Sequence, residues 1–290
     1  MSPVVLDALA EGWAQIALAL FTTFTSSGIV GYVICAIYLL TRSDDDARMR
    51  IGRFLIIPLG AVIFGLIAST NHLGRPSNTL YVLSGIGRSP LSNEVVAVVV
   101  FTGLAWIAWL TSFGHRRGRT IMKVMLVVSL PAAVASLVFM ANAYSIDTII
   151  TWSLPSAQMG LRLAGLTGGP MLALCALVAG GEDRPRLFLG LIIACTIAAI
   201  IGSLVQMMQY LALDSVESGL LRASELVPFY PACIVVSLAL TLGSQVIGIM
   251  RLHAHEPLKV PTAALMTTMV LAGILLVRFC FYCTHLTAGI

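Results

Sequence analysis

Long apolar segments separated by short polar stretches dominate the sequence. Runs of about 20 apolar residues recur along the whole chain, and each can cross about 30 Å of hydrocarbon as a helix. A backbone in lipid must satisfy its own hydrogen bonds, so such runs form helices. Eight spans are predicted, at about residues 14–40, 53–71, 94–113, 121–143, 160–180, 186–210, 227–250 and 261–284.

Composition places the chain in a lipid bilayer. The sequence is 58% hydrophobic and 10% charged, with a mean hydropathy of +0.96, whereas a soluble domain carries roughly 25% charged residues. The polar stretches between the spans are too short for a separate soluble domain. The N-terminal segment has neither a basic region nor an A-x-A cleavage site, so we expect the first span to be retained. The sequence predicts an all-α integral membrane protein, with residues 1–290 forming one eight-helix transmembrane bundle.

Basic residues are unevenly divided between the two sides of the predicted bundle. Twelve lie in loops 1–2, 3–4, 5–6 and 7–8, and three lie in the loops of the other side. By the positive-inside rule the richer loops face the cytoplasm, so both termini are expected on the outer, periplasmic side of the inner membrane. The net charge of +4 reflects this topology and gives no case for a nucleic-acid partner. The twelve are Arg42, Arg48, Arg50, Arg53, Arg116, Arg117, Arg119, Lys123, Arg184, Arg186, Arg251 and Lys259, and the three are Arg75, Arg88 and Arg222.

Cysteines fall inside the predicted spans, where a thiol usually packs as a small hydrophobic group. Cys280 and Cys283 form a C-x-x-C pair, which offers two ligands where an iron–sulfur cluster needs four. Core packing is therefore the expected role of all six cysteines, which are Cys35, Cys175, Cys195, Cys233, Cys280 and Cys283.

The placement of the histidines argues against a haem. A haem with two histidine ligands needs them at matching depth on facing helices. His115, His253 and His255 fall in predicted loops, and His72 and His285 lie at outer span ends, where a haem would be pushed to the interface. We therefore predict a haem-free bundle, with no metal or other cofactor bound by this chain.

Titratable residues gather at the outer side of the predicted bundle. Singly, each has a simpler explanation: an arginine can extend to the headgroups, Asp147 can cap a turn, and Glu94 can stabilise a helix start after Ser92 and Asn93. Ionisable residues in membrane segments are nevertheless costly and mark functional sites. Six on one side favour a shared polar pocket, and they are His72, Glu94, Asp147, Arg162, Arg278 and His285.

A one-sided pocket suits an amphiphile that arrives from the bilayer, such as a quinol. Oxidation of a quinol releases two electrons and two protons, and a neutral histidine with a carboxylate can receive those protons near pH 7. A transporter would need polar groups near the midplane. Near the midplane, the polar features of this sequence are Ser26, Ser27 and an expected helix break at 168–170.

Five short motifs occur along the chain in order. They are HLGRP at 72–76, LSNE at 91–94, YSIDT-x-x-TW at 144–152, GGP at 168–170 and FY-x-x-H-x-T-x-G at 281–289. Their order and placement, with the eight spans and outer termini, resemble the membrane anchor subunit of dimethyl sulfoxide reductase. The likeness covers essentially the whole sequence.

This resemblance implies a haem-free subunit that binds and oxidises menaquinol or a similar quinol. Electrons would pass to a four-cluster iron–sulfur subunit and then to a molybdenum bis-pterin catalytic subunit. The family's histidine and glutamate at the quinol site match His72 and Glu94. We assign His72 as hydrogen-bond partner of one quinol oxygen and Glu94 as a proton acceptor. The supporting residues, chosen by placement, are Arg75, Asp147, Arg278 and His285.

Three alternatives remain at this point. A polysulfide-reductase-type anchor would differ in its substrate, and a small-molecule transporter would be active on its own in vesicles. A structural tether would keep full turnover after His72→Ala and Glu94→Ala. The docking face is also open: either the iron–sulfur subunit binds the outer face, or electrons cross part of the bundle inward.

Overall fold

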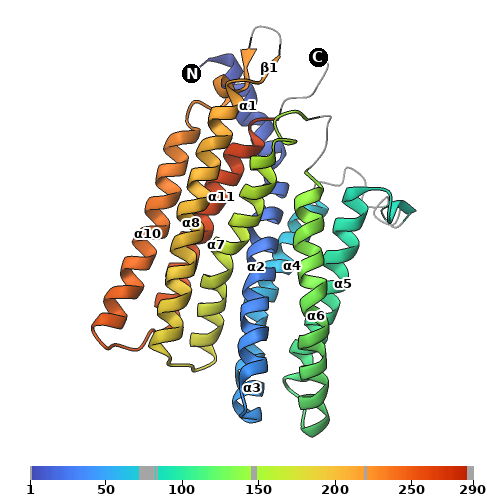
Figure 1. The fold of residues 1–290 in the computed structure, drawn as a ribbon, viewed down its shortest axis with the longest axis vertical. Helices are drawn as coiled ribbons and strands as arrows, with labels where there is room; N and C mark the ends of the chain where they lie inside the picture. Colours follow the sequence, from blue (N-terminus) through green and yellow to red (C-terminus); the bar gives the residue numbers. More distant parts are fainter. Residues whose placement is uncertain (1, 72–81, 83, 145–148, 219–220, 286–290) are drawn as a thin grey trace.

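The structure is a computed structural model that describes residues 2–71, 82, 84–144, 149–218 and 221–285 (Figure 1). Within these ranges, eight helical segments are long and apolar enough to cross a membrane, which confirms the predicted all-α membrane bundle. The second segment combines α3 (Asp45–Gly52), the 3₁₀ turn η1 (Arg53–Leu55) and α4 (Ile56–Thr70). The other seven are α2 (Ile16–Thr41), α5 (Pro90–Thr111), α6 (Arg116–Asn142), α7 (Pro155–Ala179), α8 (Pro185–Leu213), α10 (Tyr230–His253) and α11 (Val260–Tyr282).

Shorter elements lie at one end of the bundle. Helix α1 (Pro3–Ala14) packs against the C-terminal part of α11 and against α9 (Ala223–Leu226), close to a two-residue antiparallel pair, β1 (Glu217–Ser218) with β2 (Leu221–Arg222) (Figure 1). We call this the terminal end of the bundle. Its position on the outer side of the membrane stays a prediction.

Helix α2 lies at the centre, between two groups of helices. It packs against α7 on one side and α4 on the other, α5 and α6 form a pair, and α8, α10 and α11 pack together beside α7 (Figure 1). Lipid tails are as apolar as the helices, so close van der Waals packing must hold such a bundle together. Glycines provide it: a methyl group at Gly165 of α7 would meet the Ser26 carbonyl oxygen at 3.1 Å, and one at Gly28 of α2 would meet the Pro58 carbonyl oxygen at 2.6 Å.

Helix α7 runs without interruption through Gly168-Gly169-Pro170, so the predicted break in this span is wrong. Proline removes one backbone donor, but neighbouring helices in a membrane bundle accommodate the loss. The two glycines pack against α2, where a methyl group at either position would clash with Ser27 or Val30. The sequence GGP therefore serves close packing of α7 on α2.

Two helix starts also differ from the prediction. Helix α5 begins at Pro90, with the Ser89 hydroxyl accepting from the Ser92 amide at 3.5 Å, so Glu94 lies in the second turn and not at the helix start. Proline is well suited to the first helical position because it has no amide to leave unpaired. Helix α1 was not predicted, because a 12-residue segment with two acidic residues, Asp7 and Glu11, is too short to cross the membrane.

The packing of α4 on α2 gives a test with a matched control. In Gly65→Ala the new methyl group would clash with the Thr25 side chain and meet Thr25 N at 3.1 Å and the Phe21 carbonyl oxygen at 3.2 Å, whereas Gly60 of the same helix has nothing within 4 Å. Overpacking costs about 1–3 kcal/mol. We expect Gly65→Ala to lower the thermal unfolding midpoint of the solubilised protein and Gly60→Ala to leave it unchanged. Equal midpoints for the two variants would contradict this packing.

Candidate functional site

Three of the six residues proposed for the quinol site can be located in the structure. Glu94, Arg278 and His285 are described, whereas His72, Arg75 and Asp147 lie outside the described residues. The site is therefore built from Glu94 and Arg278, which are buried at the terminal end of the bundle, and from the residues that surround them.

Glu94 is a buried carboxyl group in the second turn of α5. It is 3% exposed, and its Oε1 has no hydrogen-bond partner among the described residues. Burial of a carboxyl oxygen without a partner costs free energy that most positions avoid. Such a group is suited to exchange a proton or to receive a hydrogen bond from a ligand.

Arg278 is buried one turn before the end of α11. It is 1% exposed, so its predicted alternative of extending to the headgroups is wrong. Its Nε donates to Thr22 Oγ1 at 3.2 Å and its Nη2 donates to the Tyr282 hydroxyl at 3.2 Å. The guanidinium also lies 4.4 Å from the centre of the Phe281 ring, a favourable cation–π arrangement. These contacts hold a permanent positive charge inside the bundle.

Tyr144, just after α6, is hydrogen-bonded to the network around Arg278 and is affected by the charge of Glu94. Its hydroxyl hydrogen-bonds the Tyr282 hydroxyl, which in turn accepts from Arg278. Burial raises the pKa of Tyr144 well above its usual value, the neighbouring Tyr282 phenol and Glu94 carboxyl group raise it further, and the Arg278 charge opposes them. Tyr144 therefore lies within electrostatic range of both Glu94 and Arg278, and its phenol stays protonated.

We call Glu94, Tyr144, Tyr282, Arg278 and Thr22 the buried polar chain. Its hydrogen bonds run from Tyr144, after α6, through Tyr282 and Arg278 of α11 to Thr22 of α2, and Glu94 of α5 acts on Tyr144 through its charge alone. The sequence analysis did not single out the two tyrosines and the threonine, because it considered only acidic residues, arginines and histidines. Both tyrosines lie inside quoted motifs, YSIDT and FY-x-x-H, so a search for hydroxyl donors at span ends would have found them.

An aromatic wall flanks the buried polar chain. Trp152 stacks on Phe281, with ring centres 5.7 Å apart and planes 27° apart, and its indole is 5.4 Å from the Tyr282 ring. The Trp152 Nε1 donor is buried and has no partner among the described residues. Nearby, Thr151 Oγ1 donates to the Thr284 carbonyl at 2.6 Å, which fixes the wall to the segment after α11.

His285 and Arg162 are placed differently from the expected shared pocket. His285 Nδ1 lies 3.4 Å from Glu11 Oε1 of α1, and its ring lies 5.1 Å from Trp152, so it borders the aromatic wall. Arg162 is exposed on α7 and is not part of the buried polar chain. The prediction that all six residues share one pocket is therefore wrong for Arg162, because the rotation of α7 turns this side chain outward.

Cysteine packing agrees with the sequence analysis. Cys280 and Cys283 are free and buried in an apolar cluster with Ile234 and Val277. Within the described part of the sequence, no group of three or more His, Cys, Asp or Glu side chains could hold a metal ion.

The geometry of the described residues defines a class of protein: an eight-helix membrane bundle with a buried carboxyl group and a buried, hydrogen-bonded guanidinium at its terminal end. The protein belongs to the DMSO reductase anchor subunit (DmsC) family, whose profile matches residues 9–284. This confirms the resemblance seen in the sequence, and it places the protein as a multi-pass inner-membrane anchor subunit.

Curated relatives agree over nearly the full length. The sequence is 30% identical over 288 residues to the C subunit of anaerobic dimethyl sulfoxide reductase from Escherichia coli (strain K12), and the match covers 97% of this protein and 98% of that one. It is also 30% identical over 287 residues to the anaerobic dimethyl sulfoxide reductase subunit YnfH of the same strain, with the same coverage. The C subunit from Haemophilus influenzae is 25% identical over 279 residues, covering 96% and 97%.

The buried polar chain predicts a stability effect at Tyr282. Tyr282→Phe leaves the Arg278 Nη2 and the Tyr144 hydroxyl without their shared partner, and an unsatisfied buried donor costs about 1–3 kcal/mol. We expect a lower thermal unfolding midpoint of the purified complex.

A matched control is Tyr210→Phe. The Tyr210 ring packs against Tyr230, but its hydroxyl has no hydrogen bond with any described residue. This variant should unfold like the wild type. If Tyr282→Phe also did so, the hydrogen bonds of the buried polar chain would not stabilise the fold.

Proposed function

We propose that this protein is the haem-free, quinol-oxidising membrane anchor of a molybdenum-containing respiratory reductase of the dimethyl sulfoxide reductase type. Its substrate would be menaquinol or a similar quinol, and its site would include His72 and Glu94. The observation that supports this most is the buried Glu94 carboxyl group, with an unpartnered Oε1, beside a phenol that stays protonated.

Access from the lipid is supported by a hollow between α5 and α6. It measures about 780 Å³, including space open to the surroundings, and lies beside Asn93, the residue before Glu94. Its walls are mostly apolar, with Val96 and Val100 from α5 and Phe139 from α6. Ligand pockets are usually apolar with a few polar groups. An isoprenoid quinol could therefore approach the first turns of α5 directly from the bilayer.

The chemistry assigned to the site is proton removal coupled to electron transfer. When a quinol is oxidised, its two O–H bonds break, two protons leave, and two electrons pass to an acceptor. Glu94 would take one of the protons, and His72 would hold the other quinol oxygen by a hydrogen bond. Tyr144, which stays protonated, would act as a hydrogen-bond donor beside Glu94 and would not compete for the proton.

Arg278 would act on this site from a distance. Hydrogen bonds to Thr22 and Tyr282 hold its guanidinium in place. Its charge lowers the pKa of Tyr144, whereas the Glu94 carboxyl group raises it. Through Tyr282, Arg278 also helps to hold the Tyr144 hydroxyl in place. We therefore assign Arg278 a positioning role through Tyr282 and Tyr144, and leave Arg75, Asp147 and His285 as supporting residues at the edge of the site.

Electrons would leave this subunit for a partner. The family membership supports assembly with an iron–sulfur subunit and a molybdopterin catalytic subunit, which would bind four iron–sulfur clusters and the molybdenum bis-pterin respectively. The site lies at the terminal end of the bundle. If that end faces outward, as the basic loops predict, docking of the iron–sulfur subunit on the outer face would keep the electron path short.

Glu94 gives the direct test of this function. Removal of a general base typically costs 10²–10⁴-fold in rate. In the assembled complex we expect Glu94→Gln to slow quinol-driven substrate reduction by about 100-fold or more. Reduction driven by a soluble dye that feeds the catalytic subunit should stay at the wild-type rate, since it bypasses the quinol.

The matched control is Glu225→Gln, which changes an exposed carboxylate of α9 at the same end of the bundle. Its quinol-driven rate should equal that of the wild type. A Glu94→Gln complex that oxidised quinol as fast as the Glu225→Gln complex would exclude Glu94 as the proton acceptor.

A further inference from the structure

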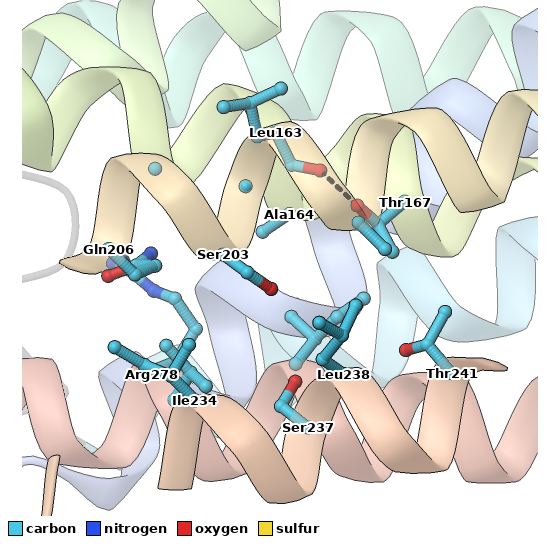
Figure 2. Close-up of a pocket in the computed structure, with 15 residues that line it drawn as sticks. Leu163, Ala164, Thr167, Ser203, Gln206, Ile234, Ser237, Leu238, Thr241 and Arg278 are labelled. Carbon is cyan, nitrogen blue, oxygen red and sulfur yellow. Dashed lines mark hydrogen bonds between the residues drawn. The ribbon is translucent and has the colours of Figure 1, made fainter. Parts of the chain in front are cut away.

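Two cavities of the bundle differ in how much room they leave. The cavity among α7, α8, α10 and α11, which Ser203, Gln206 and Arg278 help to line (Figure 2), leaves about 50 Å³ of free space, enough for a few water molecules. By the same measure, the hollow between α5 and α6 leaves about 420 Å³, which is within the range of small-molecule sites. Of the two, the hollow alone has room for a sizeable part of a ligand.

Small side chains create the space between α5 and α6. Ala132 and Ala135 line the hollow from α6, and Ala97 lines it from α5. Ala132 and Ala135 are three residues apart, so they lie on the same face of their helix. Except for Asn93, every residue of the two helices that lines the hollow is apolar. The hollow therefore suits a hydrocarbon chain better than a polar molecule.

The hollow extends from the terminal end of the bundle along both helices. Asn93 of α5 and Phe139 of α6 lie nearest that end, whereas Val100 and Ala132 lie deeper in the membrane. On each helix the two residues are seven positions apart, which is about 10 Å at 1.5 Å per residue. The long direction of the hollow therefore follows the helices, as an extended chain would.

One edge of the hollow adjoins the carboxyl group of the proposed quinol site. Ala97, which lines the hollow, lies one turn after Glu94 on a neighbouring part of the α5 surface. The outer side of the hollow is open, because the lining residue Val100 is 50% exposed and α5 and α6 form a pair at the edge of the bundle (Figure 1). A chain attached to a head group at Glu94 can thus leave toward lipid without crossing the packed core.

We propose that the hollow between α5 and α6 binds the isoprenoid tail of the quinol, and that Ala97, Ala132 and Ala135 determine the preference for a quinol with such a tail. This inference rests on the proposed function, which places the quinol head at Glu94. Lipid is as apolar as the hollow, so the tail gains van der Waals contacts and not hydrophobic free energy. These contacts also orient the head beside Glu94.

Quinol-driven turnover of the assembled complex with two substrates tests the proposal. One substrate is a quinol with an isoprenoid side chain, and the other has the same ring without a side chain. We expect Ala135→Phe, which fills the hollow, to raise the KM for the tailed quinol several-fold. The KM for the tailless quinol and both kcat values should stay at the wild-type level. Comparison of each variant with the wild type cancels the different partitioning of the two quinols into lipid.

Val134→Phe is the matched control. Val134 is the neighbouring residue on α6, but it is 58% exposed and does not line the hollow. The same aromatic ring at this position should leave the KM for both quinols unchanged. Ala132→Leu, at another lining position, serves as the filled variant if Ala135→Phe assembles poorly.

Two results would overturn the proposal. One is a KM for the tailed quinol that is the same in the filled variant and in Val134→Phe, which would mean that membrane lipid occupies the hollow. The other is an equal rise in KM for both quinols, which would mean that the substitution disturbs the head site. Glu94→Gln, in contrast, should slow the oxidation of both quinols, so failure of the proposed function and failure of the tail site give different results.

Discussion

The terminal end of the bundle is organised around a guanidinium that is buried in an apolar membrane protein. A charged group there must be hydrogen-bonded, because an uncompensated buried charge costs several kcal/mol. Arg278 meets this requirement with Thr22 of α2, with Tyr282 of its own helix and with the face of Phe281. Tyr282 then holds Tyr144, so helices far apart in the sequence meet around one charge.

Close packing below this charge gives it a rigid support. Thr22 lies one turn from Ser26, which contacts Gly165 of α7, and Thr25 contacts Gly65 of α4. Because α2 is fixed between α4 and α7 in this way, the Thr22 hydroxyl is held where Arg278 needs it. A functional group on a rigid helix is placed more accurately than one on a loop. The position of Thr22 in the buried polar chain therefore depends on the close glycine packing of α2 against α4 and α7.

Much of the fold follows from the sequence because the membrane restricts what an apolar run can do. Run length alone predicted the eight spans. It could not predict α1, which is too short to span, or the continuity of α7 through Pro170, which depends on neighbouring helices. Which face of a helix turns inward is also set by packing. For that reason two arginines near the outer ends of predicted spans differ in burial: Arg278 is buried and hydrogen-bonded, and Arg162 is exposed.

For the site, sequence reasoning identified the charged groups but not the neutral hydroxyls that surround Arg278. Glu94 and Arg278 were selected by charge, whereas Tyr144 and Tyr282 acquire their importance from contacts between distant segments. Such contacts have no local sequence pattern. His72 lies outside the described residues and stays a prediction of the sequence.

The most direct test of the central claim is the binding of a quinol analogue to membranes that contain this subunit with its partners. The account predicts that wild-type membranes bind the analogue saturably, and that His72→Ala and Glu94→Ala complexes lose this binding while still assembled. Unchanged affinity in both variants would contradict it, because the quinol would then bind elsewhere and the buried polar chain would be a structural feature.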